Sequence, residues 1–224
     1  MDEPPQPSFI KEIRGAPRGR RVLMLEDGRE FLFSDEAFEQ VDPHVGDPAT
    51  EELLQALDAA DQAAVAHEAA LRLLASRARS EKEMRTRLAM RGITPETIEE
   101  EIERLRRAGL LDDEKFARAW VEDRKRLAPR GRRMLRYELL GRGIEPESVD
   151  LVTRDIDDLE TALELARTKA RGSALANYDT FLAKVGGMLR RRGFDYSVVA
   201  EAVKRVWEEV SGERAGEEGA LEAP

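Results

Sequence analysis

The chain of 224 residues contains no cysteine, and only 5% of its residues are aromatic. Without cysteine there are neither disulfides nor thiolate metal ligands, and secretion gains no support. No apolar run approaches the ~20 residues that a membrane-spanning helix needs. Residues 1–5 are acidic and rich in proline, which is unlike a signal peptide. We therefore expect a cytoplasmic protein that does not associate with membranes.

Residues that carry catalysis are also scarce. The two histidines, His44 and His67, fall in a Pro/Gly-rich linker and at the start of an alanine-rich stretch, where surface or structural roles are the better interpretation. The loop 15–20 lacks the Gly-Lys-Ser/Thr ending of a phosphate-binding loop. The acidic run 112–114 could hold Mg²⁺ with a partner carboxylate, but acidic residues are favoured at any helix start. We expect no enzymatic activity, no cofactor and no metal.

Charge is abundant but unevenly distributed. Charged residues make up 37% of the chain, and the formal net charge is −9. Residues 1–66 hold six basic and fifteen acidic residues, whereas residues 115–142 hold ten basic and three acidic ones. The acidic total argues against nucleic acid as the main partner, but the basic segment leaves room for an anionic one.

The most prominent feature of the sequence is a motif that occurs three times. Related tripeptides lie 51 and then 50 residues apart: Arg91-Gly92-Ile93, Arg142-Gly143-Ile144 and Arg192-Gly193-Phe194. Apolar residues keep fixed offsets around it, namely Leu88, Leu139 and Leu189 before it and Ile98, Val149 and Val199 after it. Such a period indicates a repeat architecture. Each glycine is expected to end a helix in the left-handed conformation.

The first part of the chain differs from the repeats. Apolar runs at 22–25 and 31–33 flank Asp27-Gly28, which is a strong hairpin signal, and residues 9–13 could supply a third strand. Ser34 is suited to N-cap a short helix. We predict a small β-rich module over residues 1–48, with a flexible start at residues 1–7.

Residues 49–210 predict helices throughout. Ser80 and Glu83 form a capping box, and Thr94-Pro95 supplies an N-cap followed by proline. We predict three units of three helices, at about 64–110, 112–159 and 160–210, forming an elongated curved body. Gly186-Gly187 interrupts the third unit, and close packing of another backbone is one explanation. Residues 211–224 are expected to form a disordered acidic tail.

The basic segment is the strongest candidate site. Its members are Arg124, Lys125, Arg126, Arg130, Arg132, Arg133, Arg136 and Arg142. Arginine is suited to bidentate contact with carboxylate or phosphate, so these residues are candidates for contact with an acidic partner or with DNA. The alternative is a solvated helix face partly neutralised by Glu122, Asp123 and Glu138. The second and third helices of each unit could also form a helix-turn-helix-like pair, although three-helix units pack in this way for general reasons.

Several stretches resemble the RecX family, the regulatory proteins of the bacterial recombinase RecA. Residues 70–84 are similar to the family's first-unit opening, an arginine-containing turn followed by Ser-Glu-x-Glu-Leu, with Met84 in place of the usual leucine. Residues 109–117 are similar to its Gly-x-Leu-Asp-Asp-x-x-Phe-Ala junction, and the three tripeptide turns also match. The resemblance covers residues 64–210; it is weaker over the first 60 residues and least secure at Gly186-Gly187.

The resemblance implies a regulatory function. Family members bind RecA, lie in the groove of its filament on single-stranded DNA, and limit filament growth or promote disassembly. They thereby lower strand exchange, ATP hydrolysis and co-protease activity, which affects DNA repair and the SOS response. This chain is accordingly expected to act as a monomeric inhibitor, with at most weak direct DNA binding. Two alternatives stay open: a DNA-binding protein that uses the helix pairs directly, and a structural scaffold.

Overall fold

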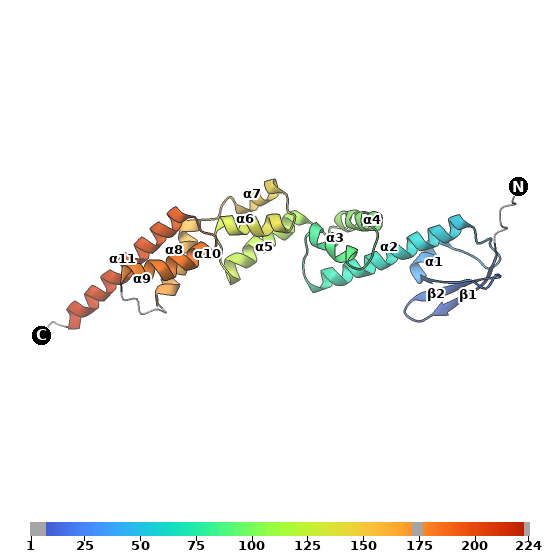
Figure 1. Cartoon of the computed structure of the whole chain (residues 1–224), viewed down its shortest axis with the longest axis horizontal. Helices are drawn as coiled ribbons and strands as arrows, with labels where there is room; N and C mark the ends of the chain where they lie inside the picture. Colours follow the sequence, from blue (N-terminus) through green and yellow to red (C-terminus); the bar gives the residue numbers. More distant parts are fainter. Residues whose placement is uncertain (1–7, 172–176, 222–224) are drawn as a thin grey trace. The chain divides into compact units, whose positions relative to one another are not determined.

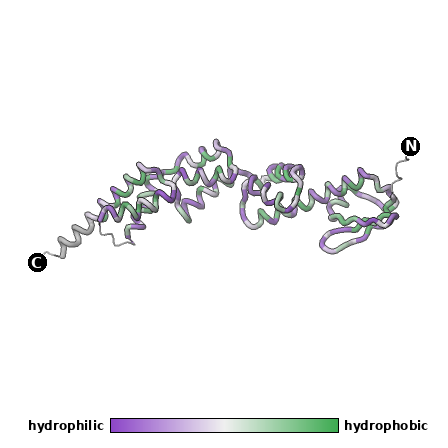
Figure 2. Tube along the Cα trace, viewed as in Figure 1, coloured by the Kyte–Doolittle hydropathy of each residue, from purple (hydrophilic) through white to green (hydrophobic). Residues whose placement is uncertain are grey.

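The computed structural model describes residues 8–171 and 177–221, and side chains as far as residue 212. It forms two compact units that divide between Leu111 and Asp112 (Figure 1). The predicted flexible start, residues 1–7, lies outside the described residues. Hydrophilic and hydrophobic residues are interspersed along the coloured helices (Figure 2), as expected for helices that bury one face.

The first unit begins with a three-stranded antiparallel sheet, as the sequence predicted. Strands β1 (Ile10–Ala16), β2 (Arg20–Leu25) and β3 (Glu30–Ser34) pair in that order. The β2–β3 hairpin turns at Gly28, where φ is 87°. Helix α1 (Asp35–Val41) follows, with Ser34 as its N-cap accepting from the amide of Ala37.

Helix α2 (Glu51–Ser76) connects this sheet to the first helical repeat without a break (Figure 1). Leu57 and Ala60 lie in the hydrophobic core of the sheet, whereas Ala69 and Ala70 lie in the core of the repeat. The compact unit therefore runs past the boundary at residues 48–49 that the sequence suggested. The reason is that residues 51–76 contain neither glycine nor proline and are rich in alanine, so two apolar stripes share one helix.

The first repeat is completed by α3 (Glu81–Ala89) and α4 (Pro95–Arg107). Both helices begin with N-caps predicted from the sequence: Ser80 accepts from the Glu83 amide at 3.2 Å, and Thr94 accepts from the Thr97 amide at 3.4 Å. The core consists of Ala69, Ala70, Met84, Leu88, Ile98, Ile102, Leu105 and Leu111.

The second repeat consists of α5 (Asp113–Leu127), α6 (Arg132–Gly141) and α7 (Pro146–Thr153). Asp112 is the N-cap of α5 and accepts from the Lys115 amide at 2.9 Å. By contrast, neither α6 nor α7 has a side-chain hydrogen bond from its own N-cap residue. The core consists of Phe116, Ala117, Val121, Leu135, Leu139, Ile144, Val149 and Ile156.

The third repeat is built from α8 (Asp158–Arg171), a continuous middle helix and α11 (Tyr196–Leu221). The middle helix comprises α9 (Tyr178–Phe181), a π-helical turn η1 (Leu182–Gly186) and α10 (Gly187–Arg191). Side chains, not another backbone, lie nearest to Gly186: a Cβ there would be 3.4 Å from Leu182 Cδ1 and 3.5 Å from Val199 Cγ1. The explanation by close backbone packing is therefore wrong at Gly186.

Helix α11 extends beyond residue 210, into the segment where the sequence suggested a disordered tail. Residues 211–221 contain no proline, and their alanine, glutamate and arginine favour a helix, whereas their three glycines weaken it. Residues 222–224 lie outside the described part of the chain.

Candidate partner-binding surface

The basic segment follows the connection between α5 and α6. Arg124, Lys125 and Arg126 occupy the last turn of α5, where cations favour the helix dipole. Arg132, Arg133 and Arg136 lie on α6. The remaining two flank that helix: Arg130 precedes its N-cap, and Arg142 is its C-cap residue.

Glu138 and Trp120 hold three of these arginines in an internal network. Glu138 Oε2 accepts from Trp120 Nε1 and from Arg124 Nε, both at 2.8 Å, and Arg130 Nε lies 3.8 Å from Glu138 Oε1. The guanidinium groups of Arg142 and Arg124 lie 3.6 and 4.2 Å from the centroid of the Trp120 ring. These contacts couple α5 to α6 through a carboxylate that is only 16% exposed. Their first role is therefore structural.

Arg132 and Arg133 lie where the second repeat packs on the third. The amide of Arg132 donates to Asp158 Oδ1 at 2.8 Å, and its guanidinium donates to the carbonyl of Ile156 at 2.7 Å. Arg133 Nε lies 3.9 Å from Asp195 Oδ1. Since the first amides of a helix have no partner within it, Asp158 caps α6 from the neighbouring repeat.

The backbones of the two repeats meet at Gly131 and Gly193. The amide of Gly131 donates to the carbonyl of Arg192 at 2.9 Å. A Cβ at Gly131 would lie 2.5 Å from Gly193 O, and one at Gly193 would lie 2.4 Å from the Cβ of Met134. No side chain fits at either position, so this joint requires both glycines.

Asp158 is ionisable and half-buried within this joint. Burial raises the pKa of Asp158 above its ordinary value, and this outweighs the lowering by the Arg132 amide and guanidinium. The charges of Asp195 and Asp157 raise that pKa further. The joint therefore contains an acid whose charged form is disfavoured by folding.

The remaining members of the basic segment are paired along or between helices. Lys125 pairs with Glu122, Arg126 with Asp123, and Arg136 with Asp150 on α7. Much of the basic segment is thus a solvated helix face that neighbouring carboxylates partly neutralise, which was the alternative to a partner-binding site. Lys125, Arg126 and Arg133 are accessible, with side chains 51%, 74% and 67% exposed.

The three tripeptide turns have the backbone predicted for them. Gly92, Gly143 and Gly193 have φ values of 80°, 82° and 86°, in the left-handed region that favours glycine. Their environments are not alike, because a Cβ on Gly92 would meet no atom within 4 Å, whereas Gly193 is enclosed.

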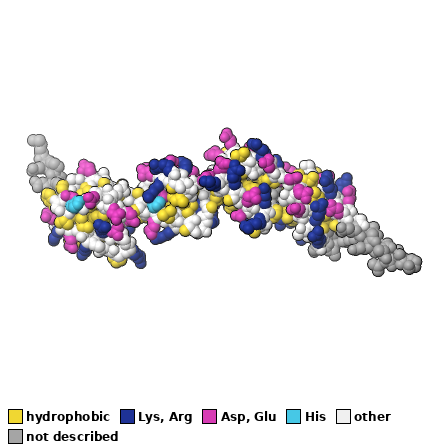
Figure 3. Space-filling model, turned by 180° about the vertical axis from the view of Figure 1, so that it is seen from behind, with side chains coloured by type: hydrophobic (Ala, Val, Ile, Leu, Met, Phe, Trp, Pro, Cys, Tyr) yellow, Lys and Arg dark blue, Asp and Glu magenta, His cyan; other side chains and the backbone are white. Residues whose placement is uncertain are grey.

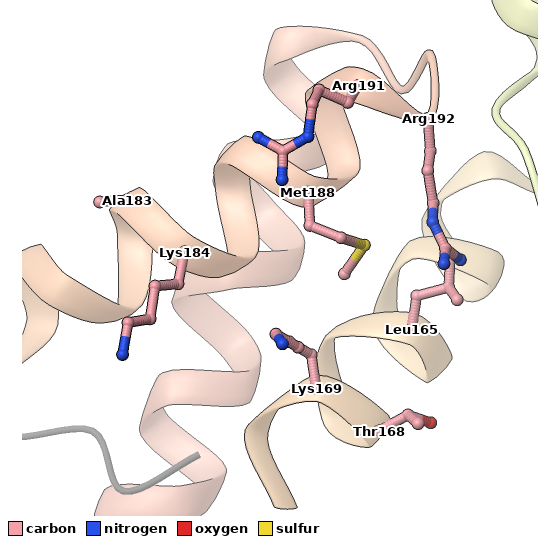
Figure 4. Close-up of a pocket in the computed structure, with 8 residues that line it drawn as sticks. All are labelled: Leu165, Thr168, Lys169, Ala183, Lys184, Met188, Arg191 and Arg192. Carbon is pink, nitrogen blue, oxygen red and sulfur yellow. The ribbon is translucent and has the colours of Figure 1, made fainter. Parts of the chain in front are cut away.

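A basic cleft in the third repeat was not predicted from the sequence. It has a volume of about 580 Å³ and lies between α8 on one side and η1 and α10 on the other (Figure 4). It is lined by Leu165, Thr168, Lys169, Ala183, Lys184, Met188, Arg191 and Arg192. Arg191 and Arg192 belong to the arginine run 190–192, which is visible in the sequence, but only the folded chain brings Lys169 and Lys184 beside them.

An exposed apolar group on α6 and α7 was also missed. Tyr137, Leu140 and Leu151 are 74%, 41% and 43% exposed. The helical period contains the signal: Leu135 and Leu139 are buried, so positions 137 and 140 fall outside the buried stripe.

Basic and acidic side chains are interspersed over the visible face of the chain (Figure 3). Within residues 8–171 and 177–221, no group of three or more histidine, aspartate or glutamate side chains is placed to hold a metal ion. Among the same residues, no helix combines the length and apolar character that crossing a membrane requires.

Comparison with known proteins identifies the family. Models of the first, second and third three-helix domains of RecX match residues 66–105, 112–152 and 155–203. A regulatory protein RecX from Mycobacterium avium is 33% identical over 165 residues, which cover 72% of this chain and 88% of the relative. The chain belongs to the RecX family. A RecX from Streptomyces coelicolor is also 33% identical, over 66% of this chain and 82% of that protein.

Solved RecX structures share the fold. A crystal structure of regulatory protein RecX aligns with a TM-score of 0.67 and 24% identity, covering 88% of this chain and 99% of that one. RecX from Lactobacillus salivarius aligns with a TM-score of 0.59 and 23% identity, covering 66% and 97%. The three-helix repeats are thus a family feature, and the chain has the regulatory role for which its relatives are named.

Proposed function

We propose that this protein binds the RecA recombinase on single-stranded DNA and inhibits its recombinase, ATPase and co-protease activities. The observation that carries the proposal is membership of a regulatory family across all three helical repeats. The chemistry then belongs to RecA, and this chain acts by binding, as a cytoplasmic monomer. Several linked repeats that each bind weakly gain strength from their high effective concentration.

Direct DNA reading by the helix pairs is the weaker candidate. In such a motif, the second helix of each pair enters the major groove and approaches phosphates. On α4, exposed residues include Glu96, Glu99, Glu100 and Glu103, and α7 exposes Glu147 and Asp150. These carboxylates would meet the phosphate backbone with like charge, which disfavours this mode of binding.

The primary test is RecA's DNA-dependent ATP hydrolysis, titrated with this protein, with binding to naked DNA measured at two salt concentrations. We expect inhibition at protein concentrations well below those that coat the DNA. No inhibition, combined with steeply salt-dependent DNA binding, would replace the proposal by the DNA-binding function.

The basic segment is tested by reversing only its accessible charges, Lys125→Glu, Arg126→Glu and Arg133→Glu together. Reversal at Arg124, Arg130, Arg132 or Arg136 would also break the contacts to Glu138, Ile156 and Asp150, and so confuse binding with folding. Arg133 pairs with Asp195 at 3.9 Å, so urea unfolding of the variant is measured alongside inhibition. We expect about a tenfold weaker inhibition, because rim charges contribute modestly to an interface.

A matched control is Arg72→Glu, Arg107→Glu and Arg205→Glu, which changes the net charge equally. Its side chains are 68%, 73% and 51% exposed and pair with carboxylates along their own helices, like Lys125 and Arg126. If both triple variants inhibit as strongly as the unaltered protein, the basic segment does not contact the filament.

A further inference from the structure

We propose that the cleft between α8 and α10 binds an acidic segment of a protein partner that also carries an apolar side chain. Four cations line it, Lys169 from α8, Lys184 from η1, Arg191 from α10 and Arg192 just beyond α10, and no carboxylate does. Figure 4 shows them arranged around the same hollow. Cations gathered in a concave site concentrate positive potential where a ligand would lie.

The cleft differs from the basic segment in how its charges are neutralised. Within residues 8–171 and 177–212, no carboxylate lies within 4.0 Å of the cationic groups of these four residues. In the basic segment, by contrast, Glu138 alone neutralises two arginines. An acidic ligand would therefore find its charge partners in the cleft unoccupied, without first displacing an internal ion pair.

The lining also contains an apolar part. Leu165, Ala183 and Met188 lie among the cations, and Met188 projects between the two walls of the cleft (Figure 4). A thioether side chain adapts to irregular apolar ligands. Arginine binds carboxylate through two parallel hydrogen bonds. This combination fits an apolar side chain flanked by aspartate or glutamate.

A nucleic-acid strand fits the cleft less well. Proteins that hold single strands combine cations with aromatic side chains on which bases stack, and none of the eight lining residues is aromatic. The net charge of −9 also disfavours a polyanion over a short acidic peptide. We take the partner that carries the acidic segment to be the RecA protomer. This identification rests on the proposed function.

The test uses the full-length protein and two short fluorescein-labelled peptides. One alternates Asp or Glu with Leu; the other replaces every acid by its amide. The cleft variant is Lys184→Glu with Arg191→Glu, both exposed. Its control, Arg154→Glu with Lys204→Glu, changes two exposed cations of the same compact unit outside the cleft. We expect the acidic peptide alone to bind, about tenfold more weakly to the cleft variant than to the control.

Three results would overturn the proposal. The first is equal binding of the acidic peptide to the cleft variant and the control, and the second is equal binding of the amide peptide. The third is binding of an oligothymidylate that the cleft variant weakens and that displaces the peptide, which assigns the cleft to nucleic acid. RecA ATPase inhibition is measured separately, so absence of inhibition by the unaltered protein refutes the proposed function, whereas peptide anisotropy decides the cleft.

Discussion

The middle helices of the first and second repeats begin in opposite ways. Helix α3 is capped by its own N-cap residue: the Ser80 hydroxyl accepts a hydrogen bond from the Glu83 amide. Helix α6 begins at Gly131, which offers no side chain, and its first amide is capped by Asp158 of the third repeat. The first repeat therefore contains its own cap, whereas the second depends on its neighbour.

The tripeptide turns show the same contrast. Gly92 and Gly193 share a left-handed backbone, but only Gly193 is enclosed, by Gly131 and Met134. A repeated sequence thus specifies the same local turn at both positions, but the surroundings of the turn differ. In the third repeat the turn is also a docking surface, and it joins repeats two and three into one compact unit.

The largest expected effect separates these two glycines. Gly193→Ala adds the cost of a left-handed alanine to a contact that cannot relax without moving the α6 backbone, and should destabilise the second unit by about 3–5 kcal/mol. Gly92→Ala meets only the backbone cost, about 1–2 kcal/mol. Urea unfolding followed by tryptophan fluorescence measures the first, because Trp120 and Trp207 both lie in residues 112–224. Circular dichroism measures the second. Equal costs would mean that the joint does not need its glycine.

A reciprocal exchange of N-cap residues sharpens the comparison. Serine is among the best N-cap residues, so Gly131→Ser should stabilise an ordinary helix start. Here its Cβ would strike the Gly193 carbonyl, and we expect a loss of about 2–3 kcal/mol. Ser80→Gly should cost only about 0.5 kcal/mol. If Gly131→Ser raised the urea midpoint of the tryptophan transition, the cap from the neighbouring repeat would be dispensable.

The two caps themselves should contribute similar amounts. Asp158→Ala removes the acceptor of the Arg132 amide, and Ser80→Ala removes that of the Glu83 amide; each should cost about 1 kcal/mol. The difference lies in which contacts are lost. Only Asp158→Ala should also accelerate amide hydrogen exchange on both sides of the joint, at the start of α6 and in the turn at Gly193. Exchange that changes in α6 alone would contradict a shared joint.

Local contacts within a repeat could be predicted from the sequence, whereas contacts between repeats could not. Ser34, Ser80 and Thr94 were recognisable as caps because each acts within three residues of its own position. The contact of the Arg132 amide with Asp158 depends on how one repeat lies on the next, which no local pattern specifies. The same holds for the cleft cations and for the arginines gathered by Glu138. Thus the sequence indicated where the basic residues were concentrated, but not which of them are internally neutralised.

The smallest expected effect is a difference in pH dependence between two aspartate caps. Hydrogen bonds from Lys115 lower the pKa of Asp112, whereas burial raises that of Asp158. The stability from Asp112 is therefore present above the unfolded pKa of ~3.9 and is lost as pH falls through the lower folded value. Asp158 has the opposite sign: the folded protein loses stability as pH rises from ~3.9 to the higher folded value. Relative to the unaltered protein, Asp112→Asn should thus become less destabilising on acidification below pH ~4. Asp158→Asn, which keeps an oxygen acceptor, should gain relative stability as pH rises above ~4. Urea midpoints measured from pH ~3 to ~7 separate the two, and parallel profiles would show that burial in the joint does not govern the titration of Asp158.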